Sequence, residues 1–245
     1  MITESCIYQV STFTALLEAV LDGDTTYGEI KLHGDFGLGT FNGVDGEMIA
    51  LDGEYYQLHA GGSVSVVHDD QQTPFAAVTY FNAQTELQLP NQLTEGELFT
   101  LIDSTTHAEH DYFAIRVDGT FSKMHVRCPR KASKPYPSLL ELTRTQVEVT
   151  LTDVTGSIVG FKSPQEAQGT TVAGYHLHFI TNDRTAGGHV LGFTLNNGVL
   201  LIDHESGLFV DRPEGAQLSR SHLTAREIGE QIEASEGLTR HSASD

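Results

Sequence analysis

The sequence predicts an α+β fold of two β-rich halves with short covering helices. Runs of β-branched and aromatic residues alternate with Asp-Gly and Asn-Gly pairs, a pattern typical of antiparallel hairpins. Ser/Thr-x-x-Glu capping boxes open short helical segments. A segment with three prolines and dense positive charge, 128–137, marks a linker. We therefore expect an N-terminal mixed-sheet half at 1–130 and a C-terminal antiparallel half at 131–245, together one domain.

The first half is predicted to begin with a helix and to continue as strands. Ser11 or Thr12 caps an apolar repeat at helical spacing, which Gly23 ends. A capping box that begins at Thr94 opens another helix, which runs to about Asp103. The predicted strands are 48–51, 55–58, 63–67, 76–81, 112–117 and 120–127, with hairpin turns at Asp52-Gly53 and Asp118-Gly119.

The second half is predicted to be a small antiparallel barrel or open sheet. A short helix spans 138 to about 146, and a closing helix runs from the capping box at Thr224 to Glu236. The last residues, 238–245, are expected to fray. The predicted strands are 147–151, 156–161, 174–180, 188–195 and 199–202, with an edge strand at 208–211.

Acidic residues outnumber basic ones, and this limits the partners. The 245 residues include 33 Asp plus Glu against 14 Lys plus Arg, a net charge of −19. This charge repels phosphate backbones and anionic membranes, so we expect neither nucleic acid nor membrane as a partner. Cys6 and Cys128 form no Cys-x-x-Cys motif, and neither a signal peptide nor an apolar window of membrane-spanning length is evident. These features favour a cytoplasmic protein.

The segment 33–48 is dense in glycine and therefore permits close approach to a ligand. It lacks the third glycine of the dinucleotide fingerprint, and no Gly-Lys-Ser/Thr follows it. A phosphate-binding loop is therefore rejected.

Three histidines in the second half have the spacing of a metal site. His176 and His178 alternate along one strand and so share a face. If the chain turns near Asp183-Arg184, His189 falls opposite His178, within reach of a common ion. Three neutral imidazoles suit zinc and leave a coordination position for water or substrate, which is the catalytic pattern.

Two other functions fit a three-histidine site on strands. A cupin-like iron or manganese oxygenase also uses His-x-His with a distant third histidine. Against it, the third histidine follows only 11 residues after the second, and no His-x-His-x(3–5)-Glu run occurs. A non-enzymatic zinc-stabilised β module would be expected to fill the fourth position with Cys or His, and none lies near the triad in sequence.

A similarity between two segments of the chain predicts a carboxylate near the three histidines. The segment 46–53 can be laid on 188–195 with a matching apolar pattern. A diverged duplication of the two halves would give Glu47 and His189 equivalent strand starts. A third charged group, Arg127, shares a strand face with His125.

Taken together, His-Gly-Asp-Phe-Gly-Leu-Gly-Thr-Phe-Asn at 33–42, Asp-Gly-Glu-Met at 45–48, and the run 174–189 resemble the alpha-acetolactate decarboxylase family. The resemblance covers nearly the whole chain. It implies a zinc-dependent, usually dimeric enzyme that converts 2-acetolactate to acetoin and carbon dioxide.

The resemblance also implies roles for individual residues. The zinc ligands are His176, His178 and His189; Glu47 and Arg127 match active-site residues, and Thr40 contacts substrate. A glutamate from the C-terminal tail is also required, for which Glu236 is the best match and Glu233 the alternative.

The expected chemistry agrees with these assignments. A zinc ion that chelates the hydroxyl and ketone of the substrate stabilises an enediolate as carbon dioxide leaves. The guanidinium of Arg127 donates two hydrogen bonds to the substrate carboxylate, and stereospecific protonation of the carbon follows. The sequence leaves Glu236, Glu233 and Glu47 as candidate proton donors.

Overall fold

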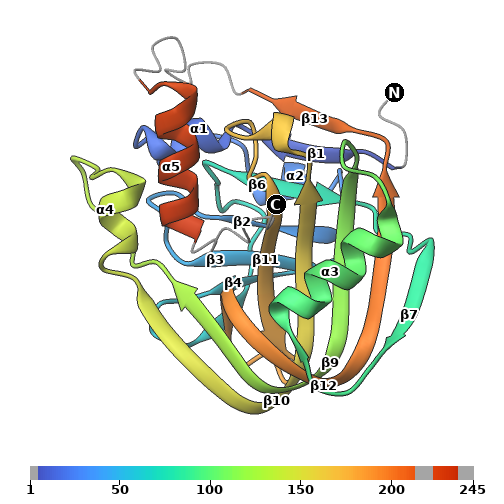
Figure 1. The fold of residues 1–245 in the computed structure, drawn as a ribbon. Coiled ribbons are helices and arrows are strands. Elements are labelled where there is room, and N and C mark those ends of the chain that lie inside the picture. The colour runs from blue at the N-terminus through green and yellow to red at the C-terminus, as the bar shows by residue number, and fades with distance from the viewer. Residues whose placement is uncertain (1–4, 213–222, 237–245) are drawn as a thin grey trace.

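The computed structural model describes residues 5–212 and 223–236. Strands dominate this part of the chain, and short helices lie against them (Figure 1). The strands are β1 (Ile7–Val10), β2 (Phe36–Thr40), β3 (Glu47–Leu51), β4 (Glu54–Leu58), β5 (Val64–Val66), β6 (Ala76–Thr79), β7 (Thr85–Leu89), β8 (Leu93–Thr94), β9 (Tyr112–Cys128), β10 (Val147–Ser163), β11 (Gly174–Thr181), β12 (Gly187–Glu205) and β13 (Leu208–Asp211). The α+β prediction is confirmed.

The helices are short and begin at caps. They are α1 (Phe13–Leu17), α2 (Tyr27–Ile30), α3 (Glu95–Thr106), α4 (Leu139–Thr143) and α5 (Ala225–Glu236), with a 3₁₀ turn at Gln165–Ala167. Capping boxes open α2, α3 and α4, and the Thr224 hydroxyl accepts from the Glu227 backbone at the start of α5. Within the described residues, no helix has the length and apolar character that spanning a membrane requires.

Two sheets are formed by the described residues. The first has seven strands in the order β13-β1-β6-β2-β3-β4-β5, and β13 is its edge, as predicted. The second runs β11-β10-β9-β12-β7, with β8 beside β12, and β11 also pairs with β12. The sheets exchange strands across residue 130, because β9 lies inside the second sheet and β13 completes the first.

Of the hairpins predicted at the two Asp-Gly pairs, one is right and one is wrong. Asp52 and Gly53 have φ of 54° and 81° and turn β3 into β4, as expected. At Asp118-Gly119 the chain instead continues through the long strand β9, and the segments 188–195 and 199–202, predicted as separate strands, are both part of β12. The segments predicted as separate strands around Asp153 likewise form one strand, β10.

Pairing on both sides explains this difference. Gly119 of β9 lies opposite Gly156 of β10 and Gly198 of β12. A Cβ at any of these glycines would collide with a backbone carbonyl oxygen of the neighbouring strand. The glycines therefore let three long strands pair side by side at close distance, and this long-range pairing outweighs the local preference for a turn.

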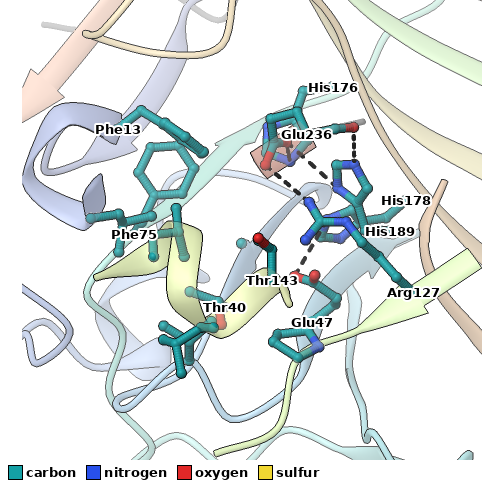
Figure 2. A pocket seen from close by; sticks show the side chains of 16 residues that line it. Phe13, Thr40, Glu47, Phe75, Arg127, Thr143, His176, His178, His189 and Glu236 are labelled. Atoms are coloured by element: carbon teal, nitrogen blue, oxygen red, sulfur yellow. Dashed lines mark hydrogen bonds and ion pairs between the residues drawn. The ribbon is translucent and has the colours of Figure 1, made fainter. Parts of the chain in front are cut away.

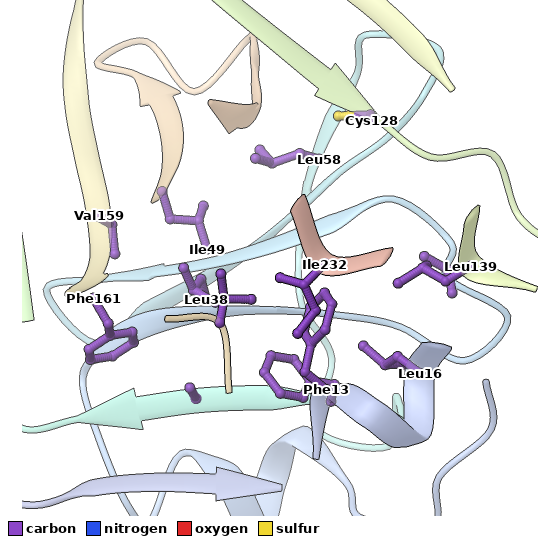
Figure 3. Packing of buried hydrophobic residues seen from close by; sticks show 14 of the residues in the cluster. Phe13, Leu16, Leu38, Ile49, Leu58, Cys128, Leu139, Val159, Phe161 and Ile232 are labelled. Atoms are coloured by element: carbon purple, nitrogen blue, oxygen red, sulfur yellow. The ribbon is translucent and has the colours of Figure 1, made fainter. Parts of the chain in front are cut away.

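A hydrophobic core between the sheets fixes the end of the last helix. Leu38 and Ile49 of the first sheet and Val159 of β10 belong to one buried cluster with Ile232 of α5 (Figure 3). Ile232 is completely buried, and burial of such a side chain contributes about 1.5–3 kcal/mol. This anchor holds the C-terminal residue of α5, Glu236, against the centre of the molecule.

Candidate metal centre

Three buried histidines converge where β11 meets β12. His176 and His178 alternate along β11, and the β11–β12 register places His189 directly opposite His178. The three ring centroids lie 5.2–5.4 Å apart, and one nitrogen of each ring lies within 4.8 Å of the others (Figure 2). The predicted turn near Asp183-Arg184 is present, since Arg184 has φ of 57°.

Backbone carbonyls orient two of the rings. His178 Nδ1 lies 2.7 Å from the Met48 carbonyl oxygen, and His189 Nε2 lies 3.3 Å from that of Glu236. Because a carbonyl only accepts, these nitrogens carry the protons, which leaves His178 Nε2 and His189 Nδ1 with free lone pairs. His178 Nε2 is buried without a hydrogen-bond partner among the described residues.

The rings are held in the neutral form that binds metal. Burial lowers the pKa of His176 to about 3, with nearby Arg127 adding to the effect. Burial also lowers the pKa of His178 and of His189 well below the usual value. Three neutral, buried imidazoles whose ligand atoms converge, two of them with a free lone pair, fit a zinc-like ion.

Two carboxylates flank the triad from distant parts of the chain. Glu47, the first residue of β3, places Oε2 3.6 Å from His178 Nε2. Glu236 Oε2 lies 3.3 Å from His176 Nε2 and 3.7 Å from His189 Nδ1, yet makes no hydrogen bond within the described part of the chain. Both groups are at least 93% buried, with exposures of 7% and 5%.

Burial governs the protonation of these carboxylates. It raises the pKa of Glu47 to about 8, against the opposing charge of Arg127 and with a further increase from Glu236. Burial likewise raises the pKa of Glu236, although Arg127 works in the other direction. A resident cation would favour the charged form of both groups.

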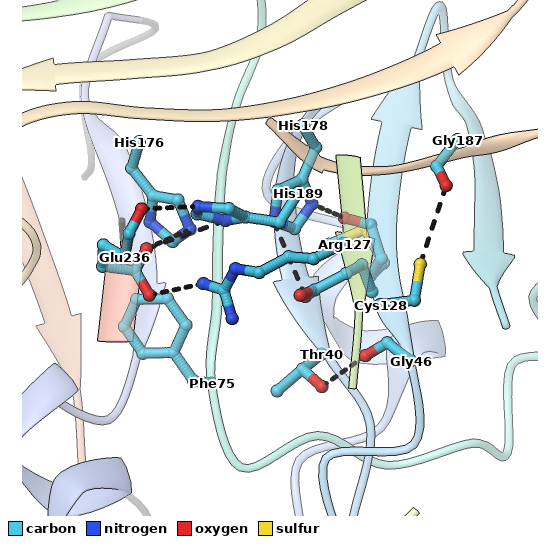
Figure 4. Close-up of polar contacts among 12 residues, drawn as sticks. Thr40, Gly46, Phe75, Arg127, Cys128, His176, His178, Gly187, His189 and Glu236 are labelled. Atoms are coloured by element: carbon cyan, nitrogen blue, oxygen red, sulfur yellow. Dashed lines mark hydrogen bonds and ion pairs between the residues drawn. The ribbon is translucent and has the colours of Figure 1, made fainter. Parts of the chain in front are cut away.

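Arg127 supplies the buried positive charge of the site. It lies on β9 opposite His189, and its Nη2 donates to Glu236 Oε1 at 3.0 Å (Figure 4). Its Nη1 donates to Gln146 Oε1 at 3.0 Å. The buried Nε has no partner among the described residues, so the guanidinium keeps a donor for a ligand.

An apolar wall closes the cavity around these groups. Thr40 also lines it, with its hydroxyl committed to the Gly46 carbonyl oxygen at 2.7 Å. The remaining wall residues are Phe13, Leu16, Gly39, Val44, Phe75, Pro129, Leu139, Leu142 and Thr143. Helices α1, α4 and α5 therefore cover a largely apolar pocket with a charged floor.

The structure brings together the residues that the sequence singled out. Thr40, Glu47, Arg127, the triad and Glu236 all line one pocket, whereas Glu233 is not among its lining residues. Sequence reasoning missed Gln146, the Met48 carbonyl and the apolar wall. The one sequence signal for Gln146 was its spacing of two residues from Glu148, which places both side chains on one strand face. A backbone carbonyl, such as that of Met48, gives no signal in the sequence.

Comparison with known proteins supports the same conclusion as the geometry of the site. The family model described as alpha-acetolactate decarboxylase matches residues 7–225. The alpha-acetolactate decarboxylase of Methylococcus capsulatus is 43% identical over 208 residues, 85% of this chain and 80% of that protein. The Bacillus subtilis enzyme is 37% identical over 233 residues, covering 95% and 91%.

A solved structure extends this similarity to the fold. The crystal structure of alpha-acetolactate decarboxylase from Bacillus subtilis strain 168 superposes with a TM-score of 0.92 at 37% identity, over 96% of this chain and all of that one. The chain belongs to the alpha-acetolactate decarboxylase family and is a carboxy-lyase.

Proposed function

We propose that this protein catalyses zinc-dependent decarboxylation of 2-acetolactate to acetoin and carbon dioxide. The observation that carries the proposal is the set of inward, unprotonated histidine nitrogens beside a buried arginine and two buried carboxylates. Membership of the family favours this reaction over the oxygenase and the non-enzymatic β module.

The reaction requires a place for electrons and a source of one proton. The bond between the carboxylate and the carbinol carbon breaks, its electron pair enters the adjacent ketone, and the same carbon is later protonated. His176, His178 and His189 would hold the zinc ion, which when bound supplies a Lewis acid for the hydroxyl and ketone oxygens.

Arg127 binds and orients the leaving carboxylate. Its Nε has no other partner in the part of the chain that the structure describes, and its Nη2 is fixed by Glu236. A planar guanidinium presents paired donors to a carboxylate, an arrangement that a lysine cannot reproduce. Holding the carboxylate out of the plane of the ketone aligns the breaking bond with the acceptor orbital.

Glu47 is the proton donor in this proposal. Both glutamates are near the triad, but Glu236 accepts a hydrogen bond from Arg127 through Oε1, which favours its ionised form. Glu47 contacts the triad only through the 3.6 Å approach to His178 within the described chain. A carboxyl group on one wall delivers its proton to one face of the carbon, so the acetoin is chiral.

The apolar wall keeps water from competing for that proton. Phe13, Phe75 and Leu139 contribute ring and alkyl surface to the pocket. They also fit the methyl groups of acetolactate. Exclusion of water strengthens the interactions of Arg127 and Glu47 with the substrate.

Three further properties belong to the proposal. We propose zinc as the metal, a homodimer as the assembly and the cytoplasm as the location. Size-exclusion chromatography with light scattering tests the assembly, and elemental analysis of purified protein tests the metal.

The central experiment removes and restores the metal. The protein is stripped with a chelator, reconstituted with Zn²⁺, and assayed for acetoin from racemic 2-acetolactate. We expect activity to disappear with the metal and to return at one equivalent. Acetoin formation that is indifferent to metal would overturn the zinc role, and the absence of acetoin in all samples would overturn the reaction.

A further inference from the structure

A second hydrogen bond holds Arg127 on the side away from Glu236. Gln146 lies between α4 and β10 and accepts from Arg127 Nη1 through its Oε1 at 3.0 Å. With Glu236 on Nη2, both terminal nitrogens of the guanidinium have a partner. The plane of the guanidinium is thereby set, the buried Nε has no partner among the described residues, and each terminal nitrogen keeps one further N–H.

The amide of Gln146 has only one workable orientation. Its Nε2 donates to Glu148 Oε1 at 2.8 Å. Arginine can only donate and an ionised carboxylate can only accept, so the carbonyl oxygen must face Arg127 and the amino group must face Glu148. The other oxygen of Glu148 lies 3.2 Å from His125 Nε2, which steadies the carboxylate in turn.

The strand register makes this arrangement informative. Glu148 of β10 is the residue directly opposite Arg127 of β9. Cross-strand partners of opposite charge commonly pair. Here the carboxylate instead reaches Gln146 and His125, and a neutral carbonyl takes the place next to the guanidinium.

A neutral partner preserves the charge of Arg127. Glu236 already contributes one buried carboxylate to it. A second carboxylate at Nη1 would outweigh the single positive charge of the guanidinium and would repel an incoming anion. An amide supplies the same hydrogen bond without the negative charge.

We propose that Gln146 is a positioning residue, which orients Arg127 for a substrate carboxylate while leaving its charge available, and that Glu148 fixes the amide of Gln146. This inference rests on the proposed function, because it assigns Arg127 to the carboxylate of acetolactate. Neither residue touches the substrate, so both act through Arg127.

The test compares Gln146→Met, which keeps the size of the side chain but removes the acceptor, with Gln146→Glu, which keeps the acceptor but adds a charge. We expect Gln146→Met to raise KM about tenfold, the size of one hydrogen bond to a charged group. We expect Gln146→Glu to raise KM further. In both variants kcat should stay within about threefold of wild type, with zinc content and Tm unchanged.

Glu148 provides the test of rescue by a conservative change. Glu148→Ala frees the amide to rotate and should raise KM several-fold, whereas Glu148→Gln keeps an acceptor for Gln146 Nε2 and should restore most of the affinity. Gln88→Met, on the exposed surface of β7, is the matched control and should behave as wild type.

Each outcome separates this inference from the proposed function. Acetoin formation by the zinc-loaded wild type tests the reaction on its own. If that activity is present and Gln146→Met keeps a wild-type KM, Gln146 does not position Arg127. If Gln146→Glu equals wild type, the requirement for a neutral partner is wrong. Equal effects of Glu148→Ala and Glu148→Gln would remove the role of Glu148.

Discussion

Arg127 Nη2 donates to Glu236 Oε1 at 3.0 Å and so joins residues 109 positions apart, both 5% exposed. The contact ties β9 to the end of α5 and places a cation and an anion side by side at the metal centre (Figure 4). Neither element alone would form the site.

Arg127→Ala should retain zinc and lose turnover. Hydrogen bonds to charged groups contribute about 1.5–3 kcal/mol, so loss of the contact with the carboxylate should reduce kcat/KM by about 10- to 100-fold or more. Steady-state acetoin assays on protein of known zinc content give this ratio. Arg226→Ala, at an exposed position near the start of α5, is the control. An Arg127→Ala enzyme with normal turnover would exclude Arg127 from the reaction.

His178→Ala should abolish metal binding. The ring is 1% exposed, its Nε2 has no hydrogen-bond partner among the residues described, and the Met48 carbonyl holds its orientation. Loss of one of three ligands leaves too few donors for a stable site. Elemental analysis after dialysis should show less than a tenth of the wild-type zinc. His204→Ala, a half-exposed histidine paired with Asp111, should keep full metal content. Stoichiometric zinc in His178→Ala would contradict the assignment of the ligand.

Which residues of this site could be predicted from the sequence depends on how far apart along the chain they lie. His176 and His178 are two residues apart and need only the alternation of a strand. His189 needs one turn more, at a position that Asp183-Arg184 signals. These local rules are sufficient for the triad. Glu47, Arg127 and Glu236 carried no local signal that links them to it, and the resemblance to a family supplied that link.

In the fold, too, local features were predicted from the sequence and long-range ones were not. The Asp52-Gly53 hairpin is a local structure, and it was predicted correctly. Asp118-Gly119 has the same residues, but strands on both sides hold it extended, and the Asp118 carboxylate accepts from Ser157 and Arg116. Sequence patterns that report on turns do not identify pairing partners far along the chain, such as Ser157, which lies 39 residues from Asp118. Gln146 was not predicted for the same reason, because its partner Arg127 lies on another strand.

Gly156→Ala should destabilise the protein although its backbone angles suit any residue. The new methyl group would collide with the Ile180 carbonyl oxygen and press on the Phe179 ring, where β10 crosses β11. Overpacking of this kind typically costs about 1–3 kcal/mol. Urea unfolding measures the loss. Gly61→Ala, whose methyl group would meet no atom within 4 Å, is the control. Equal stability of the two variants would show that the strands separate easily at Gly156.

Glu47→Gln should form acetoin slowly and without stereochemical preference. The amide keeps the shape of the side chain but cannot donate an acidic proton, and general acid catalysis contributes about 10²–10⁴-fold. Chiral gas chromatography of the product separates the two enantiomers. Glu233→Gln, outside the pocket, should retain both rate and preference. A Glu47→Gln enzyme that makes a single enantiomer at a normal rate would move the proton donor to Glu236.

Glu205 should make stability depend on pH independently of the metal centre. This residue ends β12, is 1% exposed, and neither of its carboxylate oxygens has a hydrogen-bond partner within the described chain. Burial raises its pKa from 4.5 to about 7, and the charge of Asp203 adds to the rise. Between pH 4.5 and 7 the folded protein therefore holds a proton that the unfolded chain has released.

Stability contributed by this proton is present below pH 4.5, falls as pH rises, and is fully lost above about pH 7. Glu205→Gln cannot ionise, so it should be more stable than wild type at pH 8, on the order of 3 kcal/mol at about 1.4 kcal/mol per pKa unit. The advantage should shrink at pH 5. Urea titrations at both pH values, with the exposed Glu86→Gln as control, measure it. An unchanged difference between pH 5 and pH 8 would mean that Glu205 ionises freely in the folded protein.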